Sequence, residues 1–267
     1  MTSSFLITLR EGLEASLIVA ILLTYLSKTN RKQDARYVWI GTASAVLACL
    51  VAGTAIYLAV SGLNGKVEMA VEGTIALVAA AVLTQMIFWM RKNSQQLSAE
   101  LRAKVDKSAK TALFTIAFVA VVREGLETVL FLLSAETTSA SGVSVVVGGF
   151  IGLAASVVLG VAIFAGGRKV NLKQFFNVTA VLLILFAAGL AGKAVHEYRE
   201  LIGWENGWLV QPAWDIKNGM WASGTFYDFM KGFFGWHYAA ENIRVITDFA
   251  FLVPTLYFYR KPVKSAA

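Results

Sequence analysis

The stretch Arg10-Glu11-Gly12-Leu13-Glu14 determines how the rest of the chain is interpreted. It stands within an apolar run, residues 5–26, that is long enough to cross a membrane as a helix. A charged side chain at the centre of such a helix costs at least about 2.5–3.5 kcal/mol. Three ionisable side chains so close together therefore predict a functional site inside the bilayer.

The same five residues recur as Arg123-Glu124-Gly125-Leu126-Glu127. A second match supports a repeat, because residues 40–46 and 151–157 share a pattern rich in small side chains, which suits close helix packing in lipid. We predict two repeats, about 5–90 and about 112–196.

The composition is that of a membrane protein. Of the 267 residues, 57% are hydrophobic and 15% are charged, against about 25% charged in soluble domains. Residues 1–4 carry no basic side chain, so we predict a first membrane span here rather than a signal peptide. Each predicted span is close to the ~20 residues needed to cross a bilayer. These spans cover residues 5–26, 38–60, 70–90, 112–134, 143–165, 176–196 and 243–259.

The predicted fold is an all-α integral membrane protein with seven transmembrane helices, forming one permease domain over residues 1–267. Each repeat has three spans, so the two copies must cross the membrane in opposite directions, as in many transporters. An aromatic outer loop, about 197–242, precedes the last span, and residues 92–110 are predicted to form an amphipathic surface helix.

Most Lys and Arg residues fall after the first, third and fifth spans and in the C-terminal tail. We predict that the protein lies in a cell membrane, either the plasma or the inner membrane. The positive-inside rule then places the N-terminus outside and the C-terminus in the cytoplasm. The outer side is acidic, which indicates either a solvated face or a vestibule that concentrates cations. The candidate vestibule residues are Glu68, His196, Glu197, Asp228, Glu241 and Asp248.

The motif chemistry favours a cation site. Glutamates three apart share one helix face, and an arginine four residues before a glutamate can pair with it. Together the two copies supply four carboxylates and two guanidiniums, a set of oxygen ligands for a hard multivalent ion such as Mg, Ca, Mn or iron. The predicted ligands are Glu11, Glu14, Glu124 and Glu127, with Glu72 as an outer relay and with Arg10 and Arg123 as charge partners. An Arg–Glu pair that only joins helices, and a proton relay, are the alternatives.

Other site chemistries find little support. Cys49 is the only cysteine, which excludes an intramolecular disulfide or a thiolate cage, and His196 and His237 are too few for a histidine cage. No bound organic cofactor, nucleic-acid partner or enzyme activity is predicted.

The paired motif resembles the oxidase-dependent iron permease family, with its bacterial Efe-type and fungal high-affinity members. Residues 72–73 and 83–92 are similar to that family's third span, 171–176 with 187–190 to its fifth-to-sixth region, and 233–236 to its outer aromatic loop, where Trp236 replaces a frequent Tyr. The resemblance implies iron, ferric or ferrous, as the transported substrate and the motif glutamates as its ligands. It also implies a separate partner protein that oxidises or binds iron. A lead permease and a proton-coupled carrier for an organic solute remain alternative functions.

Overall fold

The computed structural model describes residues 2–93, 110–138, 142–164 and 172–261. Within these ranges the chain is helical and forms no named strand; the predicted surface helix at 92–110 falls largely outside them. The long helices are α1 (Thr2–Lys28), α2 (Ala35–Ser61), α3 (Lys66–Asn93), α5 (Lys110–Thr138), α6 (Gly142–Phe164), α7 (Leu172–Leu201) and α9 (Asn242–Arg260). The short ones are η1 (Lys32–Asp34), η2 (Trp208–Val210) and α8 (Thr225–Phe234).

Four helical segments of the described residues are long and apolar enough to cross a membrane by length and composition alone: Lys32–Ser61, Lys66–Lys92, Gly142–Ala162 and Gln174–Leu201. An apolar segment is helical in lipid because a helix satisfies its backbone hydrogen bonds internally. The prediction of an all-α membrane protein is therefore confirmed. Helices α1 and α5, with 27 and 29 residues, are also long enough to cross a membrane, but each carries a charged motif.

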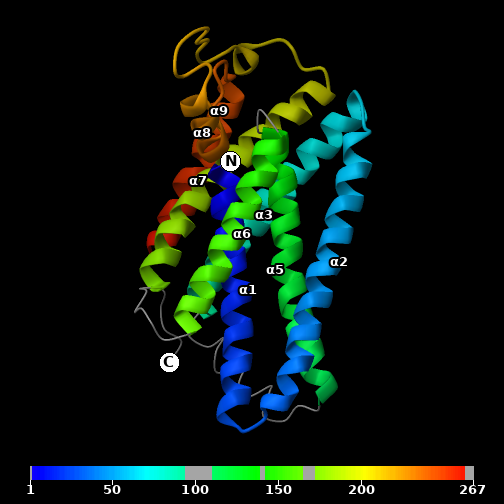
Figure 1. Cartoon of the computed structure of the whole chain (residues 1–267). Coiled ribbons are helices and arrows are strands. Elements are labelled where there is room, and N and C mark those ends of the chain that lie inside the picture. Colours follow the sequence, from blue (N-terminus) through cyan, green and yellow to red (C-terminus); the bar gives the residue numbers. More distant parts are fainter. Residues whose placement is uncertain (1, 94–109, 139–141, 165–171, 262–267) are drawn as a thin grey trace.

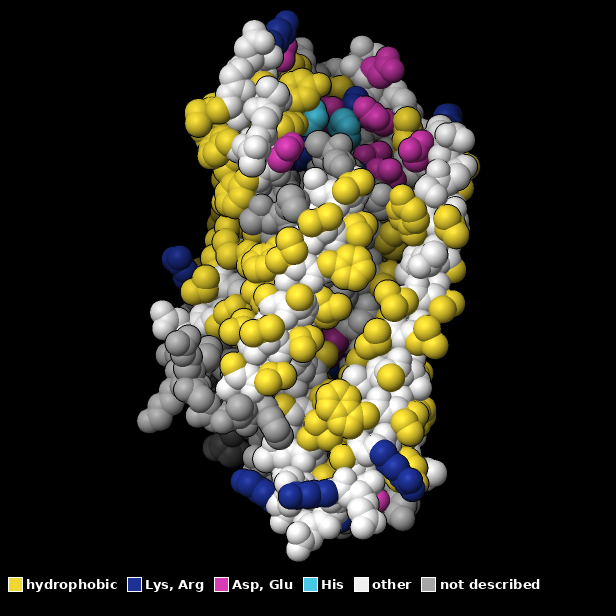
Figure 2. All heavy atoms as spheres, in the orientation of Figure 1, with side chains coloured by type: hydrophobic (Ala, Val, Ile, Leu, Met, Phe, Trp, Pro, Cys, Tyr) yellow, Lys and Arg dark blue, Asp and Glu magenta, His cyan; other side chains and the backbone are white. Residues whose placement is uncertain are grey.

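The helices pack mainly in three pairs, α1 with α6, α2 with α5, and α3 with α7, while α9 packs on α7 (Figure 1). The main buried cluster includes Ile7, Leu83, Phe131 and Ile184 from four different helices. Exposed hydrophobic side chains cover α2 and α6, as Figure 2 shows for one face, and in a membrane such surfaces contact lipid.

Glycines allow two of these pairs to approach closely. A Cβ at Gly41 of α2 would meet the carbonyl oxygen of Phe114 and the Ala117 side chain on α5. A Cβ at Gly152 of α6 would meet the Thr8 side chain on α1. The small residues singled out in the sequence thus lie at helix contacts.

The aromatic segment before α9 is tied to α7 by a contact between two backbones. A Cβ on Gly189 would lie 2.6 Å from the Cα of Gly235, which itself has a φ of +63° and follows α8. An alanine at position 189 cannot fit without separating α8 from α7.

We expect Gly189→Ala to lower the apparent free energy of unfolding in detergent by about 1–3 kcal/mol, the usual cost of overpacking. Thermal unfolding followed by tryptophan fluorescence measures this. The matched control is Gly62→Ala, because a Cβ at Gly62 finds its nearest neighbour, Leu58 O, at 3.9 Å. Equal thermal stability of the two variants would show that the Gly189–Gly235 contact is unimportant.

Candidate metal centre

The two motifs lie on the packed helices α1 and α5, and their glutamates converge. Glu11, Glu14 and Glu124 each offer a carboxylate oxygen, and these three oxygens lie within 4.8 Å of one another. Glu11 is 1% exposed and Glu124 is 5% exposed, so the cluster is removed from solvent. Figure 2 shows an acidic side chain at mid-height among hydrophobic ones.

Arg10 neutralises part of the charge on α1. Its Nη1 donates to Glu11 Oε1 at 2.7 Å, and its Nη2 lies 3.0 Å from Glu14 Oε1, as the i,i+4 spacing predicts. Arg10 is only 2% exposed. A buried guanidinium in this position holds two like charges together that would otherwise repel each other.

Arg123 plays a similar but looser part on α5. Its Nε donates to Glu127 Oε1 at 3.1 Å and lies 3.9 Å from Glu124 Oε1, while its side chain is 45% exposed. Glu127, the fourth predicted ligand, is thus held by Arg123 and is not one of the three converging carboxylates. The two halves of the site are therefore chemically alike but differ in burial.

Several carboxylate oxygens in this centre remain unclaimed. Among the described residues, Glu11 Oε2, Glu124 Oε2 and Glu127 Oε2 are buried and make no hydrogen bond. Leaving a buried acceptor unsatisfied is costly, and in a native protein it calls for an explanation such as an ion. Oxygen atoms at this spacing can chelate one hard cation.

The motif glycines bring other helices close to the centre. A Cβ on Gly12 would collide with Ser156 of α6, and a Cβ on Gly125 would lie 2.5 Å from Cys49 Sγ of α2. Each motif helix therefore packs tightly against a helix from the other half of the chain.

Glu72 lies in a different environment from the motif glutamates. Its Oε2 accepts a hydrogen bond from Lys193 Nζ at 2.7 Å, and the same Nζ lies 3.7 Å from Glu197 Oε1. Lys193 is 5% exposed and joins α3 to α7. No local pattern in the sequence indicates that this lysine faces Glu72, because the two residues are on separate helices.

Two other predicted vestibule residues form part of one ion-pair network. His196 Nδ1 lies 3.0 Å from both Glu241 carboxylate oxygens, and Arg199 Nη2 lies 3.0 Å from Glu241 Oε1. This network joins the end of α7 to the start of α9.

The remaining vestibule residues are scattered. Glu68 in the first turn of α3 and Asp228 on α8 are exposed. Asp248 of α9 faces Gly192 of α7, and its Oδ1 is buried without a hydrogen-bond partner among the described residues. The six residues therefore do not form a single cluster.

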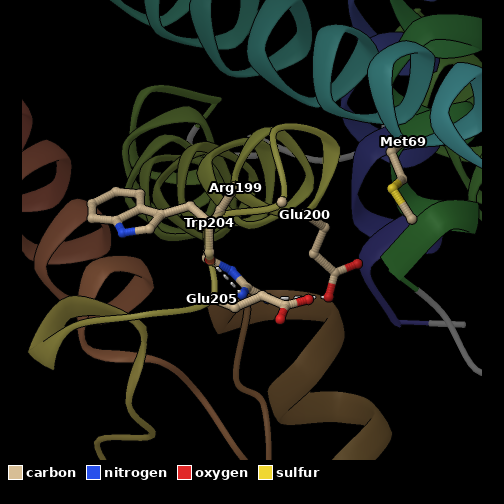
Figure 3. A pocket seen from close by; sticks show the side chains of 6 residues that line it. Met69, Arg199, Glu200, Trp204 and Glu205 are labelled. Carbon is tan, nitrogen blue, oxygen red and sulfur yellow. Dashed lines mark hydrogen bonds and ion pairs between the residues drawn. The ribbon is translucent and has the colours of Figure 1, made fainter.

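A cavity of about 250 Å³ lies at the end of α7. Figure 3 shows Met69 of α3 opposite the α7 residues Arg199 and Glu200, whose side chains form a 3.1 Å ion pair. Gly203, Trp204 and Glu205 also line the cavity. It is a polar cavity, distinct from the buried motif centre.

The comparisons with known proteins agree with the motif pattern. Residues 1–253 match the iron permease FTR1 family. The ferrous iron permease EfeU of Yersinia pestis is 35% identical over 98% of this chain and 94% of its own length. EfeU of Escherichia coli O157:H7 is 36% identical over 98% and 96%, as is a protein of E. coli K12 named putative inactive ferrous iron permease EfeU. No solved structure matches this chain.

The resemblance inferred from the paired motifs is thus confirmed, and so is the prediction of a membrane transport protein rather than an enzyme. The match spans nearly the whole sequence. The chain belongs to the iron permease FTR1 family.

Proposed function

We propose that this protein imports iron across a cell membrane through a site built by its two Arg-Glu-Gly-Leu-Glu motifs. The observation that carries the proposal is the convergence of Glu11, Glu14 and Glu124: their oxygens lie within 4.8 Å of one another, and several are buried without a hydrogen bond to any described residue. Glu127, which pairs with Arg123, completes the proposed ligand set. Carboxylate oxygens suit ferrous and ferric iron, and the curated relatives are named for ferrous iron.

In this proposal seven helices span the membrane: α1, α2, α3, α5, α6, α7 and α9. The shortest, α9, has 19 residues and a length of about 28 Å, close to the thickness of the hydrocarbon core. Together they make one permease domain, with the aromatic outer loop before α9.

The seven spans include an inverted repeat of α1–α3 and α5–α7. A two-fold axis relating the repeats exchanges the pair α1·α6 with the pair α5·α2 and maps α3·α7 onto itself, and these are the most closely packed pairs. The matched glycines support this relation: Gly41 packs on α5 as Gly152 packs on α1. Sites between inverted repeats lie near the middle of the membrane.

The distribution of charges supports the orientation that this proposal gives to the protein. Acidic and histidine side chains gather at one end of the molecule in Figure 2, and Lys and Arg side chains gather at the opposite end. The basic end is cytoplasmic by the positive-inside rule, which puts the N-terminus outside and the C-terminus inside. The acidic outer end attracts cations, and Glu72 relays them toward the motif centre once Lys193 releases it.

A separate protein outside this chain supplies any oxidation or delivery of iron, as the family resemblance implies. The iron ion itself is the transported substrate. No reaction on an organic cofactor is part of this proposal.

The direct test is uptake of iron-55 by proteoliposomes that contain the purified protein. We expect accumulation above that of protein-free liposomes, with ferrous iron kept reduced by ascorbate or with ferric iron presented as citrate. The active valence identifies the transported ion, and Glu72→Gln tests the relay by a lower rate at low iron. Absence of uptake for both valences would refute the proposal, and uptake of lead without iron would reassign the substrate.

A further inference from the structure

The two motif arginines are both held by one short segment of α3. Arg10 Nη1 donates to Met86 Sδ at 3.2 Å, and Arg10 Nη2 donates to Met90 Sδ at 3.0 Å. The Arg123 guanidinium lies over the Trp89 ring, with its central carbon 4.7 Å from the ring centroid. One turn of α3 therefore contacts the cationic member of each motif.

These contacts determine how many N–H groups remain for the glutamates. Each terminal nitrogen of Arg10 contacts one carboxylate on α1 and one methionine sulfur on α3. A guanidinium that directs all its N–H donors toward carboxylates would bind them in a bidentate manner. With some donors turned toward sulfur, Glu11 Oε2 makes no hydrogen bond within the part of the chain that the structure describes.

Neutral groups suit this task for an electrostatic reason. A thioether sulfur is a weak acceptor, and an aromatic ring attracts a cation through its quadrupole. Neither adds a negative charge to the centre. A carboxylate on α3 would hold the arginines more strongly, but it would also alter the charge that the entering ion meets.

The segment is itself fixed at its inner end. Arg91 Nη2 donates to Lys261 O at 2.6 Å and Nη1 donates to Phe258 O at 3.3 Å, which ties α3 to the end of α9. The Arg91 guanidinium also lies over the Tyr259 ring at 4.9 Å. Residues 86–90 thus sit next to an anchored point on the helix.

We propose that Met86, Trp89 and Met90 are positioning residues that hold both motif arginines toward α3 and so keep carboxylate oxygens available to the transported ion. This inference rests on the proposed function of the motif centre. When the contacts are lost, the freed guanidiniums settle on the carboxylates and compete with iron as tethered cations. Competition of this kind raises the apparent KM and leaves the maximal rate unchanged.

The first experiment compares Trp89→Leu with Trp89→Phe in iron-55 uptake, normalised to the protein in the membrane. We expect Trp89→Leu to raise the KM about threefold to tenfold, and Trp89→Phe to raise it less, because a smaller ring still binds a cation. The matched control is Trp39→Leu on α2, an exposed tryptophan at which the KM should stay unchanged. The double variant Met86→Leu with Met90→Leu should also raise the KM.

A double-mutant cycle tests whether Trp89 acts through Arg123. In an Arg123→Gln background, Trp89→Leu should no longer change the KM; where uptake is too slow, equilibrium binding of ferrous iron to the purified protein gives the same comparison. An equal effect in both backgrounds, or a lower maximal rate at constant KM, would overturn the positioning role. An unchanged KM with active uptake would overturn it and leave the proposed function intact, whereas absence of wild-type uptake would overturn the proposed function.

Discussion

Replacing Glu11 and Glu124 together by glutamine is expected to abolish iron uptake. These are the two most buried motif carboxylates, one from each half of the chain, and each has an oxygen that no described residue hydrogen-bonds. Glutamine keeps the shape but removes the charge on which a hard cation depends. Altering even an outer partner of a metal ligand costs about 10–100-fold in affinity, so loss of two ligands should cost more.

Iron-55 uptake measures this effect, with the protein amount and its elution volume in detergent as checks on folding. Asp215→Asn is a suitable control, because Asp215 is 44% exposed and pairs only loosely, at 3.6 Å, with Lys217. Its uptake should equal that of the wild type. Near-normal uptake by the double variant would contradict the motif site.

The second large effect concerns stability. Arg10→Met should lower the apparent free energy of unfolding by about 3–5 kcal/mol, because it leaves Glu11 and Glu14 as buried charges without a counter-ion. Thermal unfolding in detergent, followed by tryptophan fluorescence, gives the comparison. Adding Glu11→Gln to Arg10→Met should recover much of the stability, since it removes one of the uncompensated charges, yet transport should stay impaired.

Arg123→Met provides the internal contrast. Arg123 is 45% exposed, against 2% for Arg10, so its removal should cost clearly less stability. If both variants lost the same stability, burial would not be what distinguishes the two arginines. If Arg10→Met were as stable as the wild type, the Arg10 ion pairs would have no net stabilising role.

The positions of the helices could largely be predicted from the sequence. Long apolar runs between charged loops mark α2, α3, α6 and α7, because lipid demands internally satisfied backbone hydrogen bonds. The helix ends were less predictable: α7 continues to Leu201, so that Glu197 lies on the helix rather than at the start of the predicted loop. Hydropathy falls before a helix ends when the last turns leave the apolar layer.

The partners of the charged residues could not be predicted in the same way. Pairing between Arg10 and Glu14 follows from helical spacing, which is a local property. By contrast, Lys193 contacts Glu72 and Arg10 contacts Met86 across different helices. Such contacts depend on how the helices are rotated and shifted against each other, which no local pattern records.

The motif Arg10-Glu11-Gly12-Leu13-Glu14 illustrates the division. The sequence alone predicted that costly charges lie in an apolar helix, and it showed that the motif recurs at residues 123–127 with the same carboxylates beside an arginine. Only the tertiary structure decided that Glu124 joins Glu11 and Glu14 while Glu127 stays with Arg123. The physical reason is packing: the side chains that meet depend on the close approach of helices from both halves, and that approach is fixed by contacts spread over the whole fold.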